Sequence, residues 1–232
     1  PFGADAVDLF EDAGQLAATL RAALRSQRGV KAVFLQHTDT STGVVNDLRS
    51  LAAIVREESD ALVVVDSISG LGAEELETDG WGLDVVLSAS HKGLMAPPGL
   101  AFMAVSERAW KACEAAKLPR FYFDWRAMRK SLPNLETPFT PAVGLVAAQA
   151  ESLRLILAEG IENVWRRHAV IGTAVRNAAL AMGLSLFAEK GYESDTVTAI
   201  TLPEGIAYKA LADVLRDRYH VIIGGGLQQL QG

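Results

Sequence analysis

The first half of the chain alternates between apolar residues at helical spacing and short, continuous apolar runs. Leu16, Leu20 and Leu24 recur every four residues, which predicts a helix with a C-terminal stop at Gly29. Asn46 precedes a second stretch of helical spacing and is the predicted N-cap of that helix.

Four apolar runs, one between these helices and three after the second helix, predict strands. The run at 61–65 has no polar alternation, so a strand covered on both faces is expected there, and 31–37 also reads as a buried strand. The other two runs are 83–87 and 100–105. Strands that alternate with helices predict an α/β fold, a three-layer arrangement around a mainly parallel sheet.

The pattern changes after Pro119. An aromatic stretch and a stiff turn at 137–141 come first, and long helices are then predicted over 142–158 and 162–182. Short strands near 184–187, 196–201 and 221–223, with a helix near 208–219, complete the chain. We therefore predict that 1–158 form the latter part of a large domain and that 159–232 form a smaller, incomplete α+β domain.

The sequence has 232 residues and a net charge of −6, and no Lys/Arg cluster stands out, which argues against a nucleic-acid partner. One cysteine, Cys113, and four scattered histidines provide no metal-ligand spacing, so no metal site is expected. A reducing, cytoplasmic compartment fits this cysteine content. No apolar run is long enough to cross a membrane, so no membrane partner is expected. Because the chain starts at Pro1 and stops after a glycine-rich stretch, we expect it to be an internal part of a longer polypeptide.

Three polar segments follow predicted strands: 38–43, 66–72 and 88–92. In an open parallel sheet, ligands bind beyond the carboxyl ends of the strands, so these segments mark the expected site. Asp66 directly follows an apolar run, where a carboxylate serves either as a helix cap or loop hydrogen-bond acceptor, or as the partner of a cationic ligand group.

Lys92 lies between two apolar strands, among small residues and before a Pro-Pro-Gly turn. Most lysines are solvated surface residues. A desolvated lysine amine is a good Schiff-base nucleophile, because burial disfavours its ammonium form. Together with Asp66 and nearby hydroxyl groups, Lys92 indicates an aldehyde cofactor that carries a ring nitrogen and a phosphate.

These segments resemble the class V aminotransferases, and within them the alanine/serine–glyoxylate branch. The resemblance lies in DSISGLG at 66–72, DGWGLD at 79–84, SASHK at 88–92 and PPG at 97–99, with DTSTG at 39–43 and TPFTP at 137–141. It implies the type I fold of pyridoxal-phosphate enzymes, a pyridoxal 5'-phosphate cofactor, a homodimer with shared active sites, and small amino-acid and keto-acid substrates.

The resemblance also implies a role for each matching residue. Lys92 would bind the cofactor covalently and then move the proton at the substrate Cα, while Asp66 would pair with the ring nitrogen. Ile68 would pack on the ring face and Thr40 would hydrogen-bond near the phenolic oxygen. Phosphate contacts would come from His91 and Ser90, and from Thr140 and Thr137 toward the neighbouring subunit.

The implied activity is transfer of the amino group of alanine or serine to glyoxylate or pyruvate. The family's first phosphate loop, the aromatic residue that stacks on the ring and the arginine that grips the substrate carboxylate fall outside the sequence. The stretch by itself is therefore expected to be inactive. His91 also makes 88–92 similar to the Ser-x-His-Lys pattern of cysteine desulfurases, so a lyase on the same scaffold is an alternative, although the Pro-Pro-Gly turn and the Thr40 loop argue against it. A non-catalytic α/β module is a second alternative. We expect Cys113 and His37 to be packing residues.

Overall fold

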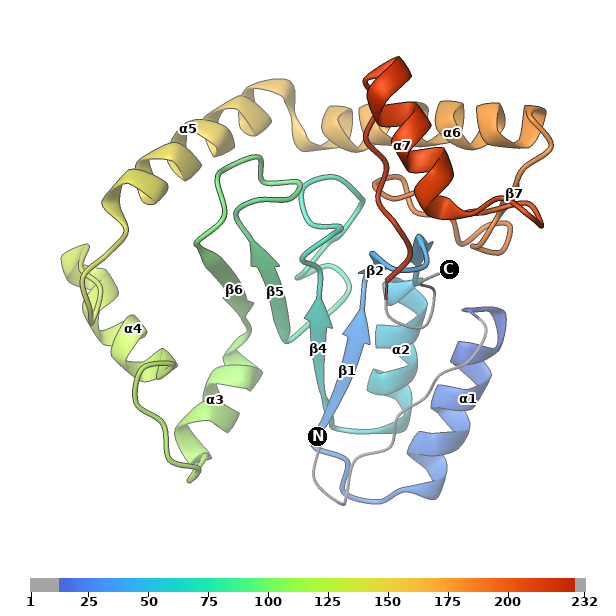
Figure 1. Ribbon diagram of the computed structural model, residues 1–232. Coiled ribbons are helices and arrows are strands. Elements are labelled where there is room, and N and C mark those ends of the chain that lie inside the picture. The colour runs from blue at the N-terminus through green and yellow to red at the C-terminus, as the bar shows by residue number, and fades with distance from the viewer. Residues whose placement is uncertain (1–12, 228–232) are drawn as a thin grey trace.

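A four-stranded sheet in the order β1-β4-β5-β6 forms the centre of the computed structural model, which describes residues 13–227. β1 (Ala32–Gln36), β4 (Leu62–Asp66) and β5 (Val85–Ala89) pair in parallel, and β6 (Ala101–Val105) pairs antiparallel with β5. The carboxyl ends of the three parallel strands therefore share one edge (Figure 1). The predicted mainly parallel α/β sheet is confirmed.

Two helices, α1 (Ala13–Ser26) and α2 (Leu48–Glu58), pack against each other and supply much of the hydrophobic core. Val63 and Val65 of β4 are fully buried in that core beside Val55 of α2. The predicted cap is wrong by one residue. The α2 N-cap is Asp47, whose side chain accepts from Ser50 N, while Asn46 Nδ2 donates to Gln36 O.

Alternate positions of the strands are much less covered. Leu62 and Val64 are only half-buried, Phe34 of β1 is 65% exposed, and Met103 of β6 is 43% exposed. In the described part of the chain, the prediction that 61–65 is covered on both faces is thus wrong, and so is the prediction that 31–37 is a buried strand. Asp66 belongs to the more open face, because it is two residues along from Val64 on the same strand.

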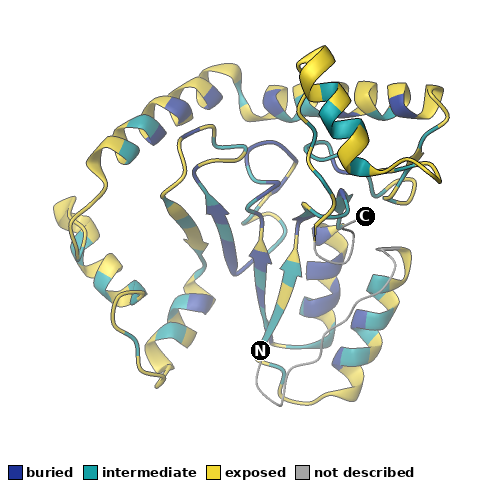
Figure 2. Ribbon diagram, viewed as in Figure 1, coloured by how far each residue is buried: buried dark blue, intermediate teal, exposed yellow. Residues whose placement is uncertain are grey.

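The remaining elements surround the sheet. They are a short pair, β2 (Thr38–Asp39) and β3 (Val44–Val45), then α3 (Glu107–Ala115), α4 (Trp125–Ser131), the 3-10 turn η1 (Leu132–Asn134), α5 (Val143–Glu159), α6 (Ile161–Ala181), a hairpin of β7 (Ser185–Leu186) and β8 (Ile200–Thr201), and α7 (Tyr208–Tyr219). Figure 2 shows buried residues concentrated on β4, β5 and α2, whereas α4 to α7 are mostly exposed.

The helices predicted over 142–158 and 162–182 are confirmed as α5 and α6, and Gly160 separates them with a φ of 86°. The strand predicted at 221–223 is wrong, because those residues form no strand in the structure. A domain division at residue 159 stays a prediction. Among the described helices, none is long and apolar enough to cross a membrane.

Candidate active site

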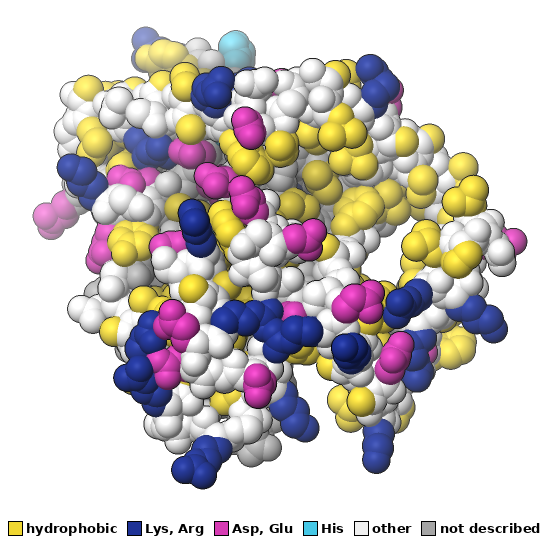
Figure 3. All heavy atoms as spheres, turned by 180° about the vertical axis from the view of Figure 1, so that it is seen from behind, with side chains coloured by type: hydrophobic (Ala, Val, Ile, Leu, Met, Phe, Trp, Pro, Cys, Tyr) yellow, Lys and Arg dark blue, Asp and Glu magenta, His cyan; other side chains and the backbone are white. Residues whose placement is uncertain are grey.

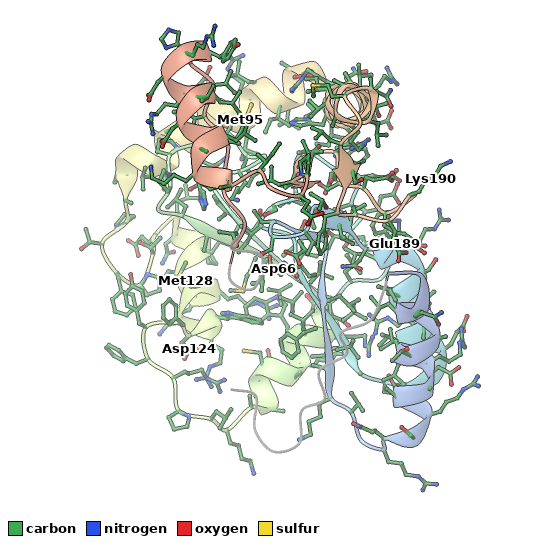
Figure 4. The ribbon with its side chains drawn as sticks, turned by 45° about the vertical axis from the view of Figure 1, so that its right-hand side comes forward. Asp66, Met95, Asp124, Met128, Glu189 and Lys190 are labelled. Carbon is green, nitrogen blue, oxygen red and sulfur yellow. The ribbon has the colours of Figure 1, made fainter. Side chains whose placement is uncertain are left out.

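Asp66 ends β4 and opens the first of three loops at the carboxyl edge of the sheet. Its side chain is exposed, and Oδ1 accepts from Ile68 N at 2.9 Å. Over residues 13–227, no lysine or arginine forms an ion pair with this carboxylate. One oxygen thus holds the loop, as the cap alternative expected, and the other is available to a cation. Figure 4 shows Asp66 between the sheet and the C-terminal helices.

The loop after β1 packs directly on this segment. Thr40 Oγ1 lies 2.5 Å from Ser69 Oγ, and His37 Nδ1 lies 2.8 Å from Ser67 Oγ. A Cβ on Gly70 would lie 2.4 Å from His37 Nδ1, so only glycine allows this approach. The pairing brings Thr40 beside the loop that carries Asp66 and half-buried Ile68.

Lys92 lies in the turn between β5 and β6, and this turn also packs against the Asp66 loop. A Cβ on Gly93 would lie 2.4 Å from Leu71 O, so the residue after Lys92 can only be glycine at this separation. The Lys92 side chain is exposed. The expectation of a desolvated lysine is therefore wrong for the part of the chain that is described.

Ser90 and His91 precede Lys92 but differ in surroundings. Ser90 is fully buried, and its hydroxyl donates to Pro97 O at 2.6 Å and accepts from Leu100 N at 3.3 Å. The Ser90 hydroxyl proton is therefore already donated to Pro97 O, and this geometry does not support the expectation that Ser90 donates to a phosphate. His91 is exposed, as a phosphate donor must be.

Thr137 and Thr140 lie elsewhere, between η1 and α5. Both are exposed, and Thr137 Oγ1 donates to Phe139 O at 2.5 Å. Among the described residues, no hydrogen bond joins either threonine to the three loops. Their role toward a neighbouring subunit stays a prediction.

Glu74 is a buried carboxylate that the sequence reasoning missed. Its Oε1 accepts from Ser194 Oγ at 2.6 Å and from Asp195 N at 2.7 Å, and its Oε2 accepts from Thr38 Oγ1. This one side chain joins the loops after β1 and β4 to a segment 120 residues away in sequence. No local pattern signals such a long-range contact.

His37 is buried and hydrogen-bonded, as expected for a packing residue. Burial lowers the pKa of its imidazole below the ordinary value, and the nearby Glu74 carboxylate opposes that shift. No group of three or more His, Cys, Asp or Glu side chains in the described chain could hold a metal ion, and half-buried Cys113 lies on α3.

The exposed donor set fits a phosphorylated pyridine aldehyde. Asp66 offers an anion to a ring nitrogen, Lys92 offers a primary amine to an aldehyde, and Thr40 and His91 offer hydrogen-bond donors to oxygens. The three loops that carry these groups pack against one another through Gly70 and Gly93. The residues present are therefore compatible with pyridoxal phosphate.

Comparisons with known proteins agree with this geometry. The sequence model of the family described as Aminotransferase class-V matches residues 9–230. A soluble hydrogenase small subunit of Synechococcus is 41% identical over 89% of the chain and 53% of that relative. A serine–glyoxylate aminotransferase of Methylorubrum extorquens is 38% identical over 90% of the chain and 54% of its own length.

Among solved structures, pyridoxamine–pyruvate aminotransferase from Mesorhizobium loti superposes with a TM-score of 0.88 at 33% identity, covering 93% of this chain and 56% of that one. The chain thus spans about half the length of the relatives it matches. With the family match extending over nearly all of its residues, the chain belongs to the class V aminotransferases.

Proposed function

We propose that the full-length protein uses pyridoxal 5'-phosphate to transfer the amino group of a small amino acid to glyoxylate or pyruvate. One observation carries the proposal: the Asp66 carboxylate and the Lys92 amine follow neighbouring parallel strands and are exposed on loops that touch at Gly93. The acceptors named for the Methylorubrum and Mesorhizobium proteins support the choice of keto acid.

The bound cofactor supplies an electron-withdrawing ring for the carbanion at the substrate Cα. Lys92 Nζ would hold the cofactor through its aldehyde and, once the substrate's amino group had displaced it, would carry the proton that leaves or reaches the Cα. Asp66 Oδ2 would stabilise a proton on the ring nitrogen, because an anion beside that nitrogen favours its charged form. Ile68 would pack on the ring face.

Hydroxyl and imidazole groups orient the cofactor's oxygens. One of the Thr40 and Ser69 hydroxyls donates to the other, so the proton of the accepting hydroxyl would be available to the phenolic oxygen. His91 would donate to the phosphate. Ser90 holds the backbone of the lysine turn closed from inside.

We also propose a homodimer in which Thr137 and Thr140 face the partner's phosphate. Apolar side chains between α3 and α5 support this, since Phe121 is 82%, Phe123 86% and Leu135 94% exposed. In the rear view, hydrophobic side chains gather on the lobe that α4 and α5 form (Figure 3).

If the protein is a dimer through this apolar surface, a polar substitution there should lower its molar mass in solution. Phe123→Ser should shift the full-length protein toward monomer in sedimentation equilibrium, whereas Val214→Ser, at an exposed site on α7, should leave the mass unchanged. A monomeric wild type would contradict the proposal.

A cytoplasmic location is proposed from the single cysteine and is tested by cell fractionation.

Borohydride reduction of the full-length protein with its cofactor, followed by peptide mapping, tests the lysine assignment. The adduct should map to Lys92, and Lys92→Ala should abolish it. Lys31→Ala is the matched control, because Lys31 is exposed just before β1, at the opposite edge of the sheet. An adduct on another lysine would refute the assignment.

A second experiment tests the role of the carboxylate and the type of reaction. Asp66→Ala should abolish turnover but leave covalent cofactor binding, while Asp60→Ala, at the other end of the same strand, should change neither. Turnover should require a keto-acid acceptor. Release of sulfide or ammonia without an acceptor would instead indicate a lyase.

A further inference from the structure

Helix α5 buries an unusual set of side chains. Its buried residues are Gln149, Ser152 and Ile156, whereas Val146 is 51% and Leu157 is 76% exposed. The inward stripe of this helix is therefore largely polar. Burial of polar side chains is costly unless each finds a hydrogen-bond partner, so their partners explain why they are there.

Both polar side chains have the same partner. Gln149 Nε2 donates to Leu94 O at 3.1 Å, and Ser152 Oγ donates to the same oxygen. A carbonyl oxygen has two lone pairs, so α5 satisfies this carbonyl completely. Leu94 is two residues beyond Lys92, in the same turn.

The Gln149 amide is oriented by this contact alone. Its Oε1 is buried and has no hydrogen-bond partner among the described residues. A flipped amide would place that oxygen against Leu94 O, where two acceptors repel. Gln149 Oε1 therefore stays unsatisfied while Gln149 Nε2 donates to Leu94 O. This arrangement favours a specific positioning contact over general packing.

Several further contacts restrain the lysine turn. Ser90 closes its base by donating to Pro97 O, and Met95 N donates to Lys92 O within it. Met95 itself has a φ of 56°, a conformation that non-glycine residues adopt only when their surroundings hold them. The Leu94 side chain lies over Gly72 of the Asp66 loop, and its carbonyl faces α5.

We infer that Gln149 and Ser152 are positioning residues for Lys92: they clamp Leu94 O and so fix the turn from which the amine reaches the cofactor. The inference rests on the proposed role of Lys92. It assigns to α5 a function that its exposed apolar side chains do not suggest. The clamp acts through the backbone, so it requires no contact with the cofactor.

The test uses the full-length protein with Gln149→Leu and Ser152→Ala combined. Without cofactor, amide hydrogen exchange at Met95 and Ala96 should accelerate about tenfold relative to wild type, because two hydrogen bonds are lost and each contributes about threefold. Ile156→Val is the matched control, because it weakens packing on the same stripe and leaves both donors in place. Equal exchange in the double variant and the control would overturn the inference.

With cofactor, the double variant should lose kcat about tenfold while KM for the amino donor stays within about twofold, because the clamp orients the proton-transfer amine rather than the substrate. Ser152→Thr keeps the hydroxyl and should recover most of the rate relative to Ser152→Ala. A change in KM alone would overturn the inference. Mapping of the borohydride adduct separates the proposed role of Lys92 from the proposed clamp. An adduct on another lysine would refute the role of Lys92, whereas the exchange data would still show whether Gln149 and Ser152 hold the turn.

Discussion

Replacement of Glu74 by alanine is the sharpest test of how the site is held together. Glu74 is 6% exposed and accepts from Thr38 Oγ1, Ser194 Oγ and Asp195 N. The change removes the acceptor of three donors at once: the Thr38 and Ser194 hydroxyls, which are buried, and Asp195 N, which is partly buried. It also separates the loops around Thr40 and Asp66 from the segment after α6 at their shared junction.

The contacts set the expected magnitude. A buried donor without an acceptor costs about 1–3 kcal/mol. Three donors at the lower bound give a loss of about 3 kcal/mol in the free energy of unfolding, since water entering the vacated space offsets part of the penalty. Glu74→Gln keeps one carbonyl oxygen for Ser194 and Asp195, so its loss should be about 1 kcal/mol.

Urea unfolding of the full-length protein measures the total change, and hydrogen exchange of residues 38–43 and 192–197 measures the junction itself. The matched control is Glu75→Ala, because Glu75 is the exposed neighbour with the same side chain. If Glu74→Ala differed from Glu75→Ala by less than about 1 kcal/mol, the assignment of Glu74 as the junction would be refuted.

Three further changes test other parts of the structure. Because burial lowers the pKa of His37 below 6.5, the unfolded chain binds a proton that the folded protein excludes, and stability should fall as pH drops below 6.5. His37→Gln should flatten this dependence in unfolding curves, and an unchanged slope would contradict the cause. Gly93→Ala should weaken pyridoxal-phosphate binding in equilibrium dialysis, because its Cβ would meet Leu71 O at 2.4 Å, whereas Gly144→Ala has open space and should bind normally. Asp84→Ala should lose about 3 kcal/mol in urea unfolding, because the buried Asp84 carboxylate accepts from Arg56 at 2.7 Å, Val63 N at 2.9 Å and Ser106 Oγ at 2.7 Å; a loss similar to that of an exposed carboxylate would refute this.

Periodicity predicted α1, α2, α5, α6, α7 and the central strands, because helix and strand spacing is visible in neighbouring residues, but it did not predict α3 or α4. The sequence also placed Asp66 and Lys92 at the carboxyl edge of the sheet, since the end of an apolar run marks the end of a strand. Their motifs indicated the family before any geometry was known.

Only the tertiary structure decided what each side chain faces. Lys92 is exposed, Ser90 is occupied by Pro97 O, and Glu74 reaches Ser194 across 120 positions of sequence. Burial and hydrogen bonding depend on residues that are distant in the chain, and the local sequence pattern does not show which distant residues come into contact. For the same reason, the apolar composition of α5 conceals that its inward face is polar and holds the turn that carries Lys92.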